Sequence, residues 1–142
     1  MRKAVIIFGV FFIVCMCMGS GQNDPAEKLI GKWSVADKFG KGSGEAEFKA
    51  DNTYILTEIH ADGTGVTHKG QYKLEASQEP YAIDLCVGEC GVPGSEWTTT
   101  FGILRFISDN EAEIHFDPSG QRPVSFDNTE EANIHHLSRK TE

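Results

Sequence analysis

The sequence predicts an all-β protein, folded as a single antiparallel up-and-down β-barrel of about eight strands. Short runs rich in Thr, Val, Ile, Phe and Tyr recur along the chain, and apolar and polar residues alternate within them. Asp51-Asn52, Asp62-Gly63 and Asp109-Asn110 separate successive runs, and such pairs suit tight hairpin turns. Closure into a barrel would remove exposed sheet edges. The expected strands are residues 32–36, 44–50, 53–61, 66–75, 81–87, 97–107, 111–116 and 123–126.

The first 21 residues have the pattern of an export signal. Arg2 and Lys3 precede an apolar run over residues 4–18, which is shorter than the roughly 20 residues that a membrane span needs. Small residues follow this run and end it. We therefore predict a bacterial secretory signal peptide over residues 1–21, in preference to a retained anchor helix.

Cys17 is the candidate for lipidation. Residues 14–17, Val-Cys-Met-Cys, resemble the end of a lipoprotein signal, except that Met16 stands where a small residue is expected. Ordinary cleavage at the glycines that follow fits as well, so a periplasmic or secreted protein and an outer-membrane-anchored lipoprotein both stay open. The polar residues 22–28 would form a tether. An acyl chain on Cys17 would be the only link to a membrane.

Composition points to one acidic domain. About 120 residues remain after the signal, which is enough for a single core. The chain has 13 Lys and Arg against 21 Asp and Glu, a formal charge of −8, and loss of Arg2 and Lys3 makes it −10. Without a basic patch we expect no nucleic-acid partner. We assign residues 29–128 to the barrel, with a helical turn at 25–30, and 129–142 to a polar tail, either frayed or a short helix.

Two cysteines remain in the predicted domain, Cys86 and Cys90. Export makes a disulfide between them chemically reasonable. It would close a very small loop, so it would fix the end of one strand more than it would stabilise the whole fold. Two thiols alone are too few for a structural zinc site.

Five segments together resemble a family of short, exported bacterial domains with lipocalin-like, calycin-type barrels, most of them of unknown function. The segments are residues 29–33 (LIGKW), 48–54 (FKADNTY), 70–74 (GQYKL), 80–85 (PYAIDL) and 120–126 (GQRPVSF). The resemblance covers about residues 29–128. It implies a barrel and a small apolar ligand, and it brings no catalytic residues with it.

The same resemblance implies a structural pair at one end of the barrel. In lipocalins an arginine from the last strand stacks on the tryptophan of the first strand. Here Trp33 would close the barrel end, and Arg122, in the last expected strand, would form the cation–π contact with it.

Histidines raise the question of a metal. His60 and His68 flank the Asp62-Gly63 turn, and Glu58 is two residues from His60, so the three side chains could bind zinc if the strand register placed them on one face. We favour the alternative that both histidines are solvent-exposed polar residues near a hairpin tip. No Gly-x-Ser-x-Gly motif and no phosphate-binding loop occur, so we expect no enzyme, no catalytic residues, no metal and no cofactor.

Two functions remain. In the first, the barrel holds a small hydrophobic molecule, although the same side chains could instead fill the core completely. The expected lining is Phe48, Tyr54, Leu56, Tyr72, Leu74, Phe101 and Leu104. In the second, the barrel is an interaction module of the envelope, for example a hydrolase inhibitor, with loops 38–43 and 88–96 contacting a protein partner. A cavity above about 300 Å³ would favour the ligand, and a solid core with apolar loops would favour the partner.

Overall fold

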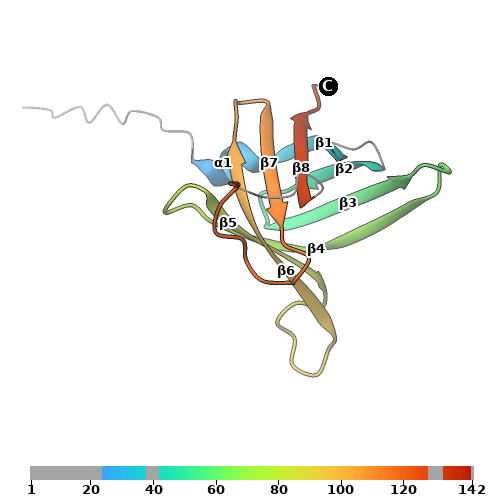
Figure 1. The fold of residues 1–142 in the computed structure, drawn as a ribbon. Coiled ribbons are helices and arrows are strands. Elements are labelled where there is room, and N and C mark those ends of the chain that lie inside the picture. Colours follow the sequence, from blue (N-terminus) through green and yellow to red (C-terminus); the bar gives the residue numbers. More distant parts are fainter. Residues whose placement is uncertain (1–23, 38–41, 128–132, 142) are drawn as a thin grey trace, which may run out of the picture.

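A computed structural model describes residues 24–37, 42–127 and 133–141, and it shows a closed antiparallel barrel (Figure 1). Each strand pairs with the next, and the eighth pairs with the first, which confirms the predicted fold class. The elements are α1 (Pro25–Leu29), β1 (Gly31–Asp37), β2 (Gly42–Phe48), β3 (Thr53–His60), β4 (Gly65–Glu75), β5 (Tyr81–Gly88), β6 (Trp97–Phe106), β7 (Glu111–Phe116) and β8 (Ile134–Arg139).

Parts of the sequence predictions lie outside the described residues. These parts are the signal segment 1–21 with Cys17, the start of the tether, residues 38–41 of the first predicted contact loop, residue 128 of the predicted barrel, and residues 129–132 and 142 of the predicted tail. Within the described ranges, no helix is long and apolar enough to cross a membrane.

The last strand differs from the prediction. Residues 123–126 form no strand, and β8 lies instead at Ile134–Arg139, inside the segment predicted to be a tail. Leu137 is the apolar inward residue of β8, and its inward neighbours two positions away are His135 and Arg139. Because these two inward positions are polar, β8 lacks the alternation that marks the other strands.

Residues 117–127, which we call the outer strap, cross the outside of β5, β6 and β7. Ile103 and His115 alternate with core residues and so face outward, yet they are only 3% and 6% exposed. His115 Nδ1 lies 3.2 Å from the Ser125 carbonyl oxygen, and the Arg105 guanidinium lies over the Phe126 ring. The strap thus contacts the barrel through side chains and does not extend the sheet.

Trp33 closes one end of the barrel, as predicted, but its partner is not Arg122. The indole is fully buried, and its Nε1 donates to the Leu29 carbonyl oxygen at 2.8 Å. The Arg139 guanidinium carbon lies 4.2 Å from the centre of the indole. The predicted Trp33–Arg122 pair is therefore wrong: Arg122 belongs to the outer strap, and the arginine of the true last strand takes the place.

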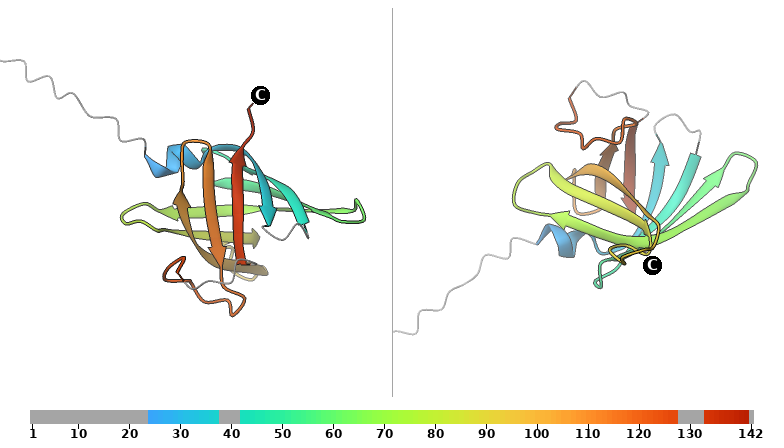
Figure 2. Two further views of the ribbon diagram at one scale, coloured as in Figure 1. Left: turned by 45° about the horizontal axis from the view of Figure 1, so that its top comes forward. Right: turned by 90° about the horizontal axis from the view of Figure 1, so that it is seen from below.

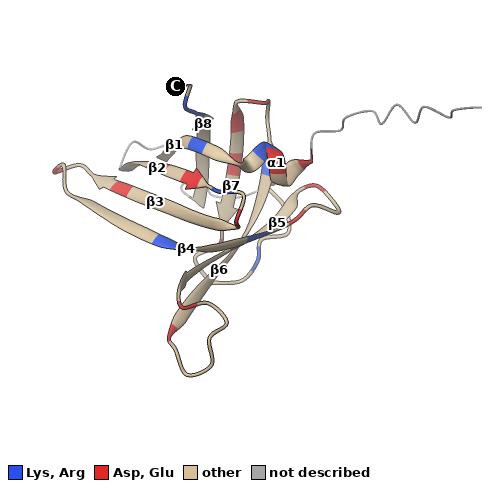
Figure 3. Cartoon of the chain, turned by 180° about the vertical axis from the view of Figure 1, so that it is seen from behind, with Lys and Arg blue, Asp and Glu red and all other residues tan. Residues whose placement is uncertain are grey.

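Arg139 also holds the backbone at this closed end. Its guanidinium donates to the carbonyl oxygens of Ile30 at 3.0 Å, Lys28 at 2.5 Å and Asp109 at 3.2 Å. Gly31 has φ of +130°, and a Cβ there would lie 2.8 Å from Arg139 Nη1, so glycine leaves room for the guanidinium. One side chain therefore joins α1, the β6–β7 turn and β8 over the Trp33 ring. Basic positions on α1, β1 and the end of β8 gather here (Figure 3).

Two hairpin turns are organised by aspartates. Asp51 accepts hydrogen bonds from Thr53 N at 3.0 Å and Thr53 Oγ1 at 2.6 Å, and Asp62 accepts the equivalent bonds from Thr64. Hydrogen bonds from the Thr53 side chain, and then from its backbone, lower the pKa of the Asp51 carboxyl from its ordinary 3.8. The turns that the sequence predicts thus depend on ionised carboxylates.

We expect Arg139→Gln to lower the free energy of unfolding by about 3 kcal/mol, because it uncovers Trp33 and leaves buried carbonyl groups without donors. Lys140→Gln is the matched control. Lys140 is the next residue and forms an exposed ion pair with Glu45, so its loss should change stability by less than about 1 kcal/mol. Urea unfolding of the three proteins measures this, and equal losses in both variants would contradict the role of Arg139.

We also expect Asp51→Asn to destabilise the protein near neutral pH. Since the folded-state pKa of Asp51 is lowered, its contribution is fully present above the ordinary value of 3.8 and is lost as the pH falls through the lower folded value. Unfolding midpoints in urea, measured over a pH series, should therefore converge for the variant and the wild type in acid. A difference that stays constant with pH would show that charge plays no part.

Candidate functional site

The barrel contains a cavity of about 440 Å³. Its deep wall consists of residues that are buried in the barrel: Ala46, Phe48, Tyr54, Leu85, Ile114 and Leu137. The lining residues that are exposed to solvent, such as Glu58, His60 and Thr100, lie near the ends of β3 and β6 that are remote from Trp33. We call this the open end of the barrel. It is the end toward which the β3–β4 hairpin reaches, away from α1 (Figure 2).

Three of the seven predicted lining residues line the cavity: Phe48, Tyr54 and Leu56. Tyr72, Leu74 and Leu104 do not, because they pack in the core nearer the closed end. Leu104 pairs with Tyr81, the first residue of β5, and Tyr72 contacts Phe48 edge-on with ring centres 5.2 Å apart. The sequence shows which residues face inward, but it does not show how far along the barrel each lies.

The prediction that Phe101 lines the cavity is wrong for a different reason. Phe101 faces outward, is 38% exposed, and lies under the Arg122 guanidinium. Its neighbour Gly102 is the inward residue, and a Cβ there would lie 2.6 Å from Cε1 of Phe116. Glycine therefore leaves room for the Phe116 ring, which lines the cavity. Residues on β1, β5, β7 and β8 that the prediction missed complete the apolar lining: Val35, Leu85, Val87, Ile114, Phe116 and Leu137.

Arg122 is held on the outside of the barrel. It forms an ion pair with the Asp84 carboxylate and donates to the Gly102 carbonyl oxygen at 2.8 Å. Asp84 and Gly102 lie on neighbouring strands, so Arg122 attaches the outer strap to β5 and β6. Its role in this structure is to fix the strap, and among the described residues it is not one of those that line the cavity.

A set of polar side chains surrounds the cavity at its open end, and we call it the polar collar. Its members come from four strands and are Glu58, His60, His68, Thr100 and His135. His68 pairs with Leu56 in the sheet, and its Nε2 lies 4.0 Å from Glu58 Oε1. Along β3 the inward residues thus change from apolar to ionisable at Glu58.

The collar decides the register question that the sequence left open. His60, His68 and Glu58 all line the cavity, so both histidines lie on the inner face. Among the described residues, however, no three His, Cys, Asp or Glu side chains are close enough together to hold a metal ion. His60 is exposed, as the favoured interpretation expected, whereas His68 is half-buried because it lies at the level of Leu56, deeper in the barrel.

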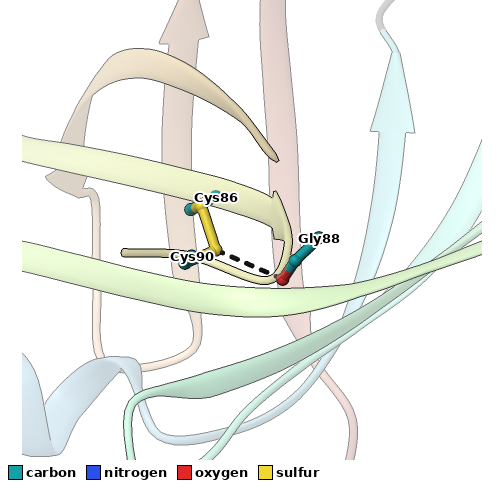
Figure 4. The surroundings of a disulfide bond; sticks show 3 residues. All are labelled: Cys86, Gly88 and Cys90. Carbon is teal, nitrogen blue, oxygen red and sulfur yellow. Dashed lines mark hydrogen bonds between the residues drawn. A yellow bond between two sulfur atoms is a disulfide. The ribbon is translucent and has the colours of Figure 1, made fainter. Parts of the chain in front are cut away.

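The predicted disulfide joins Cys86 and Cys90 (Figure 4), with their Cα atoms 6.1 Å apart. Cys90 Sγ also lies 3.5 Å from the Gly88 carbonyl oxygen. The bond is at the end of β5, beside the open end, and it fixes the start of the β5–β6 loop. Val92 in this loop and Trp97 directly after it are 47% and 46% exposed.

Comparisons of the chain with protein-family models, with curated proteins and with solved structures find no match. The resemblance to exported lipocalin-like domains therefore stays a hypothesis, and the site has to be interpreted from its own geometry.

We expect the double variant Cys86→Ser/Cys90→Ser to stay folded and to lose about 2 kcal/mol of stability. The bond closes a loop of sequence separation 4, and such short loops restrict the unfolded chain much less than long ones do. Urea unfolding and far-UV circular dichroism, with oxidised wild type as the reference, measure the effect. Loss of cooperative unfolding would mean that the disulfide supports the whole barrel and not only its rim.

Proposed function

We propose that this protein is a non-catalytic envelope protein that binds a small hydrophobic ligand inside a lipocalin-like barrel. The observation behind the proposal is the cavity of about 440 Å³ with an apolar deep wall. Its volume falls in the range of about 300–1,000 Å³ that is common for small-molecule sites. A core filled by its own side chains, the alternative left open by the sequence, would leave no such space.

The direction of entry follows from the two ends of the barrel. The closed end is blocked by Trp33, Arg139 and α1, where Leu29 and Trp33 are fully buried. A ligand would therefore enter through the open end, past the polar collar, and place its apolar part against Phe48, Tyr54 and their neighbours. Burial of apolar surface would supply most of the affinity.

The predicted export signal and the disulfide support an envelope location. The sequence begins with a pattern typical of secretory signals, and the Cys86–Cys90 disulfide suits an oxidising compartment. We propose a periplasmic or secreted protein, or a lipoprotein anchored to the outer membrane if Cys17 is acylated.

A second candidate function is the binding of an envelope protein, for example as an inhibitor of a hydrolase. It is favoured by the exposed apolar side chains of Val92 and Trp97 at the β5–β6 loop. Such residues are common at protein interfaces. Native mass spectrometry of protein purified from its own envelope separates the two candidates. An extra small mass supports the ligand, whereas co-purification of one stoichiometric protein chain supports the partner.

We expect Leu56→Trp to reduce the affinity for a neutral apolar dye, N-phenylnaphthylamine, by about tenfold or more, because the indole would occupy space in the cavity. Ile55→Trp is the matched control, since Ile55 is the preceding residue on β3 and does not line the cavity. Fluorescence titration measures both affinities. If the two variants bind the dye like wild type, binding takes place outside the barrel.

A further inference from the structure

We infer that the ligand is a single-chain amphiphile with an anionic head group, and that the polar collar holds this head group while the chain lies in the cavity. The inference rests on the proposed function and adds a chemical class to it. It starts from one observation: among the described residues, ionisable side chains line the cavity only at its open end.

The first argument is the change of chemistry along single strands. On β3 the inward residues run from Tyr54 and Leu56, which are apolar contacts, to Glu58 and His60. On β8 the inward Leu137 is followed toward the open end by His135, whose ring centre is 5.8 Å from that of Phe116. A cavity with an apolar interior and a polar mouth matches a molecule with an apolar chain and one polar end.

The second argument is the balance of charge and hydrogen-bonding groups in the collar. Three of its members are histidines, which can donate hydrogen bonds and can also carry positive charge. Thr100 adds a hydroxyl donor, and Glu58 is the single carboxylate. Donors therefore exceed obligate acceptors, so the collar suits a head group that accepts hydrogen bonds, such as a carboxylate.

The Glu58–His68 pair shows how the head group would be received. His68 lies deeper than Glu58, at the level of Leu56, and its side chain is 37% exposed against 53% for Glu58. At 4.0 Å the pair is long, and an exposed pair of this kind contributes little to stability. A ligand carboxylate could thus replace Glu58 beside His68, while the Glu58 carboxylate turns into solvent.

The net negative charge of the whole chain opposes the binding of an anionic head group at the collar only weakly. The formal charge is −8, but charges on the surface are screened beyond about 10 Å at moderate salt. The collar acts at contact distance. The net charge should slow the approach of an anion at low salt more than it weakens the bound state.

The test compares three probes with the same chain: laurate, lauryl alcohol and laurylamine. Each is titrated against N-phenylnaphthylamine bound to the full-length mature protein near neutral pH. We expect laurate to displace the dye about tenfold more tightly than the alcohol, and the amine to be the weakest, because charge-assisted hydrogen bonds favour the anion.

Two collar variants and one control sharpen the test. His68→Gln should remove most of the advantage of laurate over the alcohol, and Glu58→Gln should increase that advantage. Lys69→Gln is the control, because Lys69 neighbours His68 on β4 but is exposed and does not line the cavity. It removes a positive charge close to the collar and should leave the preference unchanged.

The outcomes separate the inference from the proposed function. If the dye binds but all three probes displace it equally, or the amine is tightest, the barrel binds apolar ligands and the anionic class is wrong. If Lys69→Gln reduces the preference as much as His68→Gln, the effect comes from overall charge and the collar assignment is overturned. If neither the dye nor any probe binds, the proposed function fails together with the inference.

Discussion

The contact between Trp33 and Arg139 is the constraint on which the rest of this barrel depends. Trp33 lies on the first strand and Arg139 on the last, and these two strands pair to close the sheet. The Arg139 guanidinium also donates hydrogen bonds to carbonyl oxygens at the end of α1 and in the β6–β7 turn. A planar group with several fixed donors can cover an aromatic face and bind the backbone around it at once, which lysine cannot do. The Trp33–Arg139 contact therefore both joins the first strand to the last and covers the end of the barrel.

Because one end is closed in this way, the two halves of the barrel differ. Large rings occupy the closed half, where Trp33, Phe48 and Tyr72 are buried and Tyr72 donates to the Lys49 carbonyl oxygen. Smaller inward residues, such as Gly44 and Thr100, follow toward the open half. The cavity extends from the buried rings of Phe48 and Tyr54 past these smaller residues to the open end.

The sequence predicted this fold because most of its strands obey a simple rule. The first seven expected strands end within two residues of the observed ones, since alternating side chains and Asp-containing turns mark them clearly. β8 does not follow this rule, because two of its three inward residues lie near the ends of the barrel and are polar. Its inward residues are His135 at the mouth and Arg139 over Trp33, and only Leu137 between them is apolar.

The wrong position of the last strand also explains the wrong partner of Trp33. Because the last strand is β8 and not residues 123–126, its arginine is Arg139, whereas Arg122 holds the outer strap on Asp84. Phe101 is a separate error, because the inward residue at this point of β6 is its neighbour Gly102. Sequence alternation gives the face of a residue but not its depth, so the members of the lining could be only partly predicted.

The cavity itself is the feature that packing alone does not account for. Protein interiors are normally filled to the density of organic crystals, and unfilled apolar volume lowers stability. Here the lining residues leave a space of about 440 Å³ unfilled, although the Phe116 ring packs into the room that Gly102 leaves. Sites that depart from good packing while the rest of a fold obeys it are where function is expected. The polar collar at the open end of the cavity departs from the usual pattern as well, because it places ionisable groups on the inner face of the sheet, which elsewhere forms the apolar core. Both departures have one explanation if the missing part of the core is a ligand with a polar end.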